Sequence, residues 1–304
     1  MGRLASIGLV GVALLSAGCG GAANASSGPA VVNAIGAENQ YANVIAQVGG
    51  RYVHVSSILS DPNTDPHTFE SSPRVAEEVT AAQLVVQNGL GYDGFMNKIE
   101  SSSPSSKRKL IIVQRLLGLG DDTANPHLWY SPDTMPAVAR AVATDLSVLQ
   151  PRHAGYFRSN LAKFEASMAP LFAAISVFKA KYGGTPVATT EPVADYLLQA
   201  MNAENLTPFV FQADIMNGVD PSPQDISSEN SFFTKHEVKV FCYNEQVVDS
   251  LTSSIRHNAE AAGIPVVGVY ETMPTPGYDF QRWMLTEVQD IEKAVSHGVS
   301  TEHL

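Results

Sequence analysis

Short apolar runs alternate with helical stretches along most of this 304-residue chain. Such an alternation predicts parallel βαβ units, because parallel neighbours in a sheet need a long crossover connection, which is usually a helix. The sequence therefore predicts an α/β fold whose mostly parallel sheets are covered by helices on both faces. The expected strands are 30–35, 52–58, 84–87, 110–113, 185–189, 208–212, 238–243 and 266–269.

The alternation stops between Pro132 and Tyr182, where only helical signals remain. Pro151 can occupy the first turn of a helix that continues to Tyr182 and ends at Gly183-Gly184. At 1.5 Å per residue this helix would be roughly 45 Å long, about the length of a whole domain. Pro170 lies inside it and should kink it. The chain would then consist of two similar lobes and a rigid helix between them, with an N-terminal lobe at 30–150, a linking helix at 151–182 and a C-terminal lobe at 183–304.

The first residues have the pattern of a secretory signal peptide, predicted to cover 1–18. Arg3 precedes an apolar run from Leu4 to Ala17, which is too short to span a bilayer. The run ends in Leu-Ser-Ala-Gly before Cys19, a pattern that is similar to the bacterial lipobox. We therefore expect a lipid on Cys19, a flexible tether at 19–29, and an extracytoplasmic protein anchored to the bacterial cell membrane.

Composition excludes some classes of function. The formal net charge is −11, and no run of Lys and Arg could follow a phosphate backbone, so nucleic acid is not an expected partner. No phosphate-binding Gly-Lys-Ser loop is present, so the chain should not hydrolyse ATP. Cys242 is the only cysteine besides Cys19 and lies in an apolar run, which predicts a buried, inert thiol and no intramolecular disulfide.

Four residues stand where predicted strands give way to loops. His67 follows an Asp-Pro pair and His127 follows an Asn-Pro pair, both in loops of the first lobe. Glu191 and Glu271 directly follow the first and last strands of the second lobe. Because open α/β sheets bind ligands at the carboxyl ends of their strands, we expect all four side chains to face one cleft between the lobes.

Each of these residues also has an ordinary explanation. A lone histidine in a polar loop is more often solvated than metal-bound, and a glutamate after a strand is more often a helix cap or a surface group. As a set, however, His67, His127, Glu191 and Glu271 offer two imidazoles and two carboxylates without a thiolate. That donor set suits a borderline-to-hard divalent cation.

Together these features resemble the metal-binding lipoproteins of bacterial zinc and manganese ABC importers. The resemblance covers nearly the whole chain, and the motifs that carry it are the lipobox, 65–70, 125–129, the long helix, 190–192 with Asp195-Tyr196, and 278–284. It implies two lobes joined by a rigid backbone helix, and one transported metal ion held by His67, His127, Glu191 and Glu271. It also implies a monomer that delivers the ion to an ABC permease energised by a separate ATPase.

Two departures from this family bear on the metal. Zinc-importing members generally have a third histidine where this chain has Glu191, and often a His/Asp-rich loop that is missing here, which favours manganese or iron. Many relatives have Asp where Glu271 stands, and the longer side chain could bind one or two positions on the ion. Mn²⁺ and Zn²⁺ therefore both stay open as cargo, with Fe²⁺ as a further alternative.

Other functions could use the same residues. A metallohydrolase holds zinc with His and carboxylate, although four protein ligands would leave little room for an activated water. A receptor for a chelated metal or haem, or a surface adhesin, could share the architecture. A solute-binding protein that is not an enzyme is the interpretation that the sequence favours.

Overall fold

The computed structural model describes residues 1–2, 31–61, 67, 69–274 and 276–304. Residues Val31–Leu304 form one compact unit. The predicted signal peptide beyond Gly2, the predicted lipid on Cys19 and the predicted tether at 19–29 lie outside the described residues.

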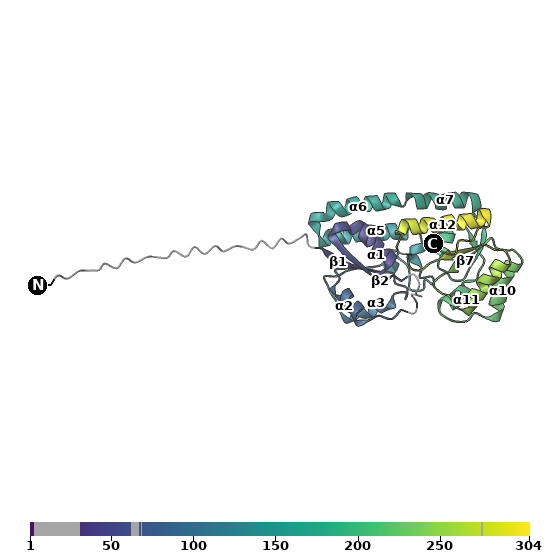
Figure 1. Cartoon of the computed structure of the whole chain (residues 1–304), viewed down its shortest axis with the longest axis horizontal. Coiled ribbons are helices and arrows are strands. Elements are labelled where there is room, and N and C mark those ends of the chain that lie inside the picture. The colour runs from purple at the N-terminus through teal and green to yellow at the C-terminus, as the bar shows by residue number, and fades with distance from the viewer. Residues whose placement is uncertain (3–30, 62–66, 68, 275) are drawn as a thin grey trace. The chain divides into compact units, whose positions relative to one another are not determined.

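The N-terminal lobe is built on a sheet of four parallel strands in the order β2-β1-β3-β4 (Figure 1). The central strands are buried along nearly their whole length, which explains why they appear in the sequence as continuous apolar runs. The strands are β1 (Val32–Glu38), β2 (Val53–Leu59), β3 (Leu84–Gln87) and β4 (Lys109–Ile112).

The C-terminal lobe repeats this arrangement with a parallel sheet in the order β6-β5-β7-β8. In both sheets the first strand along the chain lies second from the edge. The predicted α/β fold of two lobes with parallel sheets is therefore confirmed. The strands are β5 (Pro186–Thr189), β6 (Glu204–Asn205), β7 (Val240–Asn244) and β8 (Val266–Val269).

Helices follow most of the strands and cover the sheets (Figure 1). Those of the N-terminal half are α1 (Asn39–Gly49), α2 (Pro73–Ala81), α3 (Gly94–Ser102), α4 (Val113–Leu116) and α5 (Thr134–Leu149). Those of the C-terminal half are α8 (Asp195–Ala200), α9 (Phe209–Met216), α10 (Pro223–Thr234), α11 (Ser250–Ala261) and α12 (Phe280–His297). Short 3₁₀ turns are η1 (Gly50–Tyr52), η3 (Leu128–Tyr130) and η4 (Pro151–His153).

The predicted long helix is present along one side of both lobes (Figure 1). It consists of α6 (Ala154–Ser167) and α7 (Ala169–Tyr182), which are interrupted at Met168. The interruption lies next to Pro170, whose ring nitrogen cannot donate the helical hydrogen bond. The kink that the sequence predicts at this proline therefore has its counterpart in the structure.

By length and composition alone this helix could also cross a membrane, with a mean hydropathy of 1.4. In the folded unit, however, α6 packs against α1 and α5, and α7 packs against α12. Phe157, Phe164 and Phe178 are fully or almost fully buried in these contacts. We therefore regard it as a helix of the folded unit that links the two lobes.

One predicted strand is wrong. The segment 208–212 is apolar enough to suggest a strand, but it forms the beginning of α9. Phe211 and Ile215 are spaced by one helical turn and both are buried, so the helix places them together in the core. The second-lobe sheet is completed instead by the two-residue strand β6, which pairs with Pro186 and Val187 of β5.

Helix α11 begins with a capping box. The carboxylate of Asp249 accepts the backbone N–H of Thr252 at 2.7 Å, and the Thr252 hydroxyl accepts the backbone N–H of Asp249 at 3.0 Å. We expect Asp249→Ala to lower the free energy of unfolding by about 1 kcal/mol, since the backbone N–H of Thr252 loses its acceptor. Chemical denaturation of Asp249→Ala beside Asp249→Asn, which can still cap, checks this: an equal loss in both variants would contradict it.

The lobes also contact each other directly. Asn39, at the start of α1, exchanges two hydrogen bonds with the backbone of Met273, at 2.8 and 3.0 Å. The hydroxyl of Tyr130 donates to the carbonyl of Tyr270 at 2.8 Å and accepts its N–H at 3.1 Å. All four groups are buried, so the carboxyl ends of both sheets are held face to face.

Candidate metal centre

The structure brings three of the four predicted ligands together where the carboxyl ends of the two sheets meet. His67 comes from the segment after β2, His127 directly precedes η3, and Glu271 follows β8 by two residues. One ligand atom from each of the three lies within 4.8 Å of the others. Two lobes therefore contribute to a single cluster, as the sequence predicts.

The carboxylate oxygen Oε2 of Glu271 is the centre of this cluster. It lies 3.1 Å from Nε2 of His67 and 3.3 Å from Nε2 of His127. Two ligand atoms that each bind a tetrahedral ion at 2.0–2.2 Å are about 3.4 Å apart. The spacing of the cluster is thus close to the spacing of atoms that share one metal ion.

Asn125 fixes the orientation and the tautomer of His127. Its Oδ1 accepts the backbone N–H of His127 at 2.9 Å and faces the ring atom Nδ1 at 2.8 Å. An amide oxygen can only accept, so Nδ1 carries the proton and the neutral ring presents the lone pair of Nε2. That lone pair faces a carboxylate oxygen of Glu271, and a cation between the two would satisfy both.

Other side chains hold Glu271 in place. The hydroxyl of Tyr92 donates to Oε2 at 2.9 Å, and the amide Nδ2 of Asn244 donates to Oε1 at 2.8 Å. Oε1 of Gln246 accepts the backbone N–H of Glu271 and that of Thr272, at 2.6 and 2.7 Å. Hydrogen bonds of this kind orient a ligand before the ion arrives.

Glu191, the fourth predicted ligand, is buried but is not a member of the three-residue cluster. Its Oε1 accepts a hydrogen bond from Nδ2 of Asn244 at 3.0 Å. The same amide nitrogen also donates to Glu271, so Asn244 joins the two carboxylates. Glu191, on the C-terminal lobe, is therefore linked to the cluster through the side-chain amide of Asn244.

The electrostatics of the cluster favour an ionised Glu271 and a neutral His127. Burial acts to raise the pKa of Glu271, but hydrogen bonds from His127 and His67 and their charges outweigh it and hold that pKa well below its usual range. Burial lowers the pKa of His127, and Glu271 opposes this only in part. Both shifts leave the groups near neutral pH in the forms that bind metal.

Access to the cluster is through His67. Glu271 and His127 are fully buried, whereas the His67 side chain keeps 22% of its surface exposed. His67 lines two cavities of about 360 and 460 Å³, and Met216 and Asn217, at the end of α9, line both. An ion would therefore reach the cluster past these two residues.

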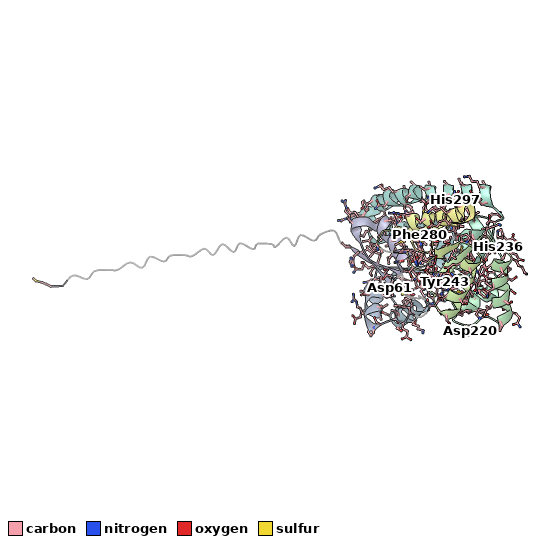
Figure 2. The ribbon with its side chains drawn as sticks, turned by 45° about the vertical axis from the view of Figure 1, so that its right-hand side comes forward. Asp61, Asp220, His236, Tyr243, Phe280 and His297 are labelled. Carbon is pink, nitrogen blue, oxygen red and sulfur yellow. The ribbon has the colours of Figure 1, made fainter. Side chains whose placement is uncertain are left out.

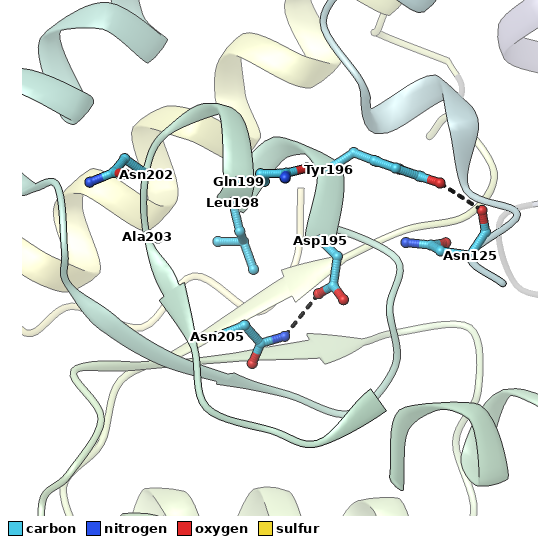
Figure 3. A pocket seen from close by; sticks show the side chains of 8 residues that line it. All are labelled: Asn125, Asp195, Tyr196, Leu198, Gln199, Asn202, Ala203 and Asn205. Atoms are coloured by element: carbon cyan, nitrogen blue, oxygen red, sulfur yellow. Dashed lines mark hydrogen bonds between the residues drawn. The ribbon is translucent and has the colours of Figure 1, made fainter. Parts of the chain in front are cut away.

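A separate cavity of about 420 Å³ is lined by Asn125 together with residues of the C-terminal lobe such as Asp195 and Tyr196 (Figure 3). There the hydroxyl of Tyr196 donates to the carbonyl of Asn125 at 2.9 Å, and the side chain of Asn125 donates to the carbonyl of Pro192 at 2.7 Å. The residue that orients His127 in the N-terminal half is thus itself held by the C-terminal lobe.

The remaining histidines lie away from the cluster. His236 and His297 are exposed on the C-terminal half (Figure 2), and His54, His257 and His303 are exposed as well. His153 is half-buried and stacks on Tyr52.

Four residues orient the predicted ligands and were not predicted from the sequence: Tyr92, Asn125, Asn244 and Gln246. Asn125 stands in the same Asn-Pro-His motif as His127, and Asn244 ends an apolar run, so both offered a signal. Tyr92 and Gln246 stand in loops and belong to no recognisable motif, and only the fold brings them to Glu271.

We expect Asn244→Ala to weaken metal binding by about 10- to 100-fold, the usual cost of losing a residue that orients a ligand. Both Glu191 and Glu271 lose a hydrogen bond from the same amide, so the two carboxylates are freed together. Calorimetric titration with Mn²⁺ and with Zn²⁺ measures the loss. Asn205→Ala is the control, because that amide serves Asp195 and Thr189 in the same lobe; an equal loss in both variants would contradict the role of Asn244.

Comparisons with known proteins are consistent across the chain. A family model described as "ZnuA: Zinc-uptake complex component A periplasmic" matches residues 37–294. The manganese-binding lipoprotein MntA of Bacillus subtilis (strain 168) is 24% identical over 157 residues, which cover 50% of this chain and 51% of MntA. The chain thus spans about half the length of this curated relative in the alignment.

Solved structures share the fold. The periplasmic zinc-binding protein TroA from Treponema pallidum superposes with a TM-score of 0.74 at 16% identity, over 88% of this chain and 99% of TroA. A crystal structure of ZnuA superposes with a TM-score of 0.71 at 21% identity, over 88% of this chain and 100% of that chain.

Proposed function

This chain belongs to the ZnuA family of periplasmic zinc-uptake complex components, and from that premise we propose that it captures a divalent transition metal between its lobes for an ABC importer. The metal is the cargo and not a catalytic cofactor. Membership of a family of transport binding proteins favours this function over the metallohydrolase alternative.

One observation carries the proposal. Oε2 of Glu271 faces the Nε2 atoms of two histidines, at 3.1 and 3.3 Å, in a buried pocket between the lobes. With Nδ1 of His127 directed to Asn125, the neutral ring presents the lone pair of Nε2 to the carboxylate. The Nε2 atoms of two histidines and a carboxylate oxygen together form a donor set for one divalent cation.

We infer that the ligands are His67, His127 and Glu271, with Glu191 as the fourth. Glu191 is linked to Glu271 through the shared amide of Asn244, and this link supports its place as the fourth ligand. Two imidazoles and two carboxylates suit Mn²⁺ or Zn²⁺, and also Fe²⁺. A carboxylate at position 191 in place of a third imidazole favours Mn²⁺, which prefers oxygen donors.

The proposal extends to the cellular setting. A lipid on Cys19 would anchor the chain outside the cytoplasm, and the membrane permease with its ATPase would receive the ion from a monomer. The relative MntA is described as a lipoprotein, which supports the anchor.

Elemental analysis of the natively purified protein, followed by competition among Mn²⁺, Zn²⁺ and Fe²⁺, tests the proposal. We expect one bound ion per chain and loss of tight binding in His67→Ala and in Glu191→Ala. Because Zn²⁺ binds most nitrogen and oxygen sites more tightly than Mn²⁺, the competition must be judged at the metal levels of the cell. Unchanged affinity in both variants would overturn the ligand assignment, and tight binding only in the presence of an organic chelator would favour the chelate-receptor alternative.

A further inference from the structure

A cluster of positive charge lies at the end of the N-terminal sheet at which its strands begin. Three exposed cations from two separate parts of the chain stand there with a small group of aromatic rings. We call it the amino-edge patch, and it consists of Arg51, Arg152 and Lys163 with Tyr52, His153 and Tyr156.

Aromatic rings hold the first of these cations in place. The guanidinium of Arg51 lies 5.0 Å from the ring centre of Tyr52 and 5.3 Å from that of Tyr156, and it donates to the Tyr52 hydroxyl at 3.0 Å. The ring of His153 stacks on Tyr52 at 3.7 Å, which brings the neighbouring Arg152 to the same place. Cation–π contacts of this kind fix a charge without neutralising it.

No acidic side chain compensates this charge. The pKa of Tyr156 is lowered by a hydrogen bond with Asn160, and then by the charges of Arg51 and Lys163, which places Lys163 in the same field. The sequence contains no Asp or Glu at 146–164. In the part of the chain that the structure describes, Arg51, Arg152 and Lys163 form no ion pair. This is unusual in a chain with a net charge of −11.

The patch lies where the chain enters the folded unit. Val32 of β1 pairs with Val53 of β2 in parallel register, so Val31 and Tyr52, the residues just before them, lie at the same end of the sheet. Cys19 is twelve residues before Val31 and can be at most roughly 40 Å from it, because an extended chain spans about 3.3–3.6 Å per residue. The metal centre lies at the opposite edge, where the strands end.

We propose that the amino-edge patch binds the phosphate groups of anionic phospholipids in the membrane that carries the anchor. Clustered Arg and Lys side chains beside a membrane are attracted by anionic headgroups, and each cation strengthens binding about fivefold within a Debye length. The short tether keeps the patch at a high local concentration near that surface. In this orientation the opening at His67 points away from the headgroups, and the ion can load before the protein meets its permease.

The proposal rests on the proposed anchoring, so the test supplies the anchor chemically. The mature chain from Cys19 is coupled through that thiol to a maleimide-lipid in vesicles, while the only other thiol, Cys242, is buried. A fluorescent amino acid is placed at Ser159 or at Ala180, two exposed positions roughly 30 Å apart along the linking helix. Nitroxide-labelled headgroups then report which end of the helix lies nearer the membrane.

With phosphatidylglycerol present at low salt, we expect stronger quenching at Ser159 than at Ala180. The preference should vanish in phosphatidylcholine alone and at high salt, because both remove the attraction. The triple variant Arg51→Gln, Arg152→Gln, Lys163→Gln should reduce the docked orientation by about 10- to 100-fold. The matched control Lys235→Gln, Lys239→Gln, Lys293→Gln removes the same charge from exposed positions of the C-terminal half and should keep the preference.

Equal quenching at Ser159 and Ala180 in the protein with an unaltered patch would overturn the proposal. Stronger quenching at Ser159 that persists in the triple variant would overturn it as well. Metal affinity, measured on the same samples, should be unchanged by the triple variant. Failure of metal binding would contradict the proposed transport function instead, and absence of a lipid on Cys19 in cells, seen by mass spectrometry, would contradict the anchoring.

Discussion

Glu271→Gln should weaken metal binding by more than about 100-fold, beyond the usual cost of losing a residue that only orients a ligand. The substitution keeps the shape of the side chain and removes the charge on the oxygen that both histidines face. The new amide keeps an oxygen that can accept from Asn244, and its NH₂ group can donate to an imidazole lone pair, so the chain should still fold without metal. The variant thus separates binding from folding.

Two measurements on the same sample check this expectation. Calorimetric titration gives the affinity, and thermal unfolding with and without metal gives the stabilisation by the ion, which for a tight ligand at a thousand times its Kd is about 4 kcal/mol. The control is Glu229→Gln, which changes a buried glutamate that accepts a hydrogen bond from Thr207 in the same lobe. Metal-dependent stabilisation that persists in Glu271→Gln would remove Glu271 from the ligand set.

Metal affinity should fall steeply as the pH drops from 7 to 5. Neutral imidazole binds the ion, and a proton on either histidine must leave before the ion can bind. Each proton that the ion must displace from an imidazole lowers the affinity by up to about tenfold per pH unit. Burial lowers the pKa of His127, so its protonation should add to the loss only at more acid pH.

Glu271 contributes no slope in this range, because its pKa is held well below its usual value and the carboxylate stays ionised. Competition titrations against a chelator of known proton affinity, at several pH values, measure the dependence. His54→Gln, which changes an exposed histidine at the start of β2, should leave the slope unaltered. A flat affinity between pH 5 and 7 would exclude ligation by neutral histidine.

Most of the fold could be predicted from the sequence because its signals are local. Buried parallel strands such as β3 and β8 appear as short continuous apolar runs, and Pro151 and Pro170 mark the start and the kink of the linking helix. The error at 208–212 has the opposite cause. A short apolar run fits a buried strand and a buried helix equally well, and only the packing of Phe211 and Ile215 decides between them.

The candidate site could be predicted only in part, for a similar reason. His67, His127 and Glu271 stand at strand ends, and the topology of parallel sheets brings such positions together. The side chains that orient them depend on contacts between distant segments, such as Tyr92 with Glu271, which no pattern in the chain records. The amino-edge patch is of the same kind, since Arg51 and Lys163 are far apart along the chain and form no basic run.

The position of Asn125 between the lobes makes the orientation of His127 depend on the contact between the lobes. This side chain sets the tautomer of His127, yet it is fastened to Pro192, and its carbonyl to Tyr196, on the far side of the interface. If the lobes part, Asn125 loses its anchor and the imidazole is free to turn over. Separation of the lobes would then also lower the affinity for the ion. A permease that separates the lobes would therefore release the ion as well.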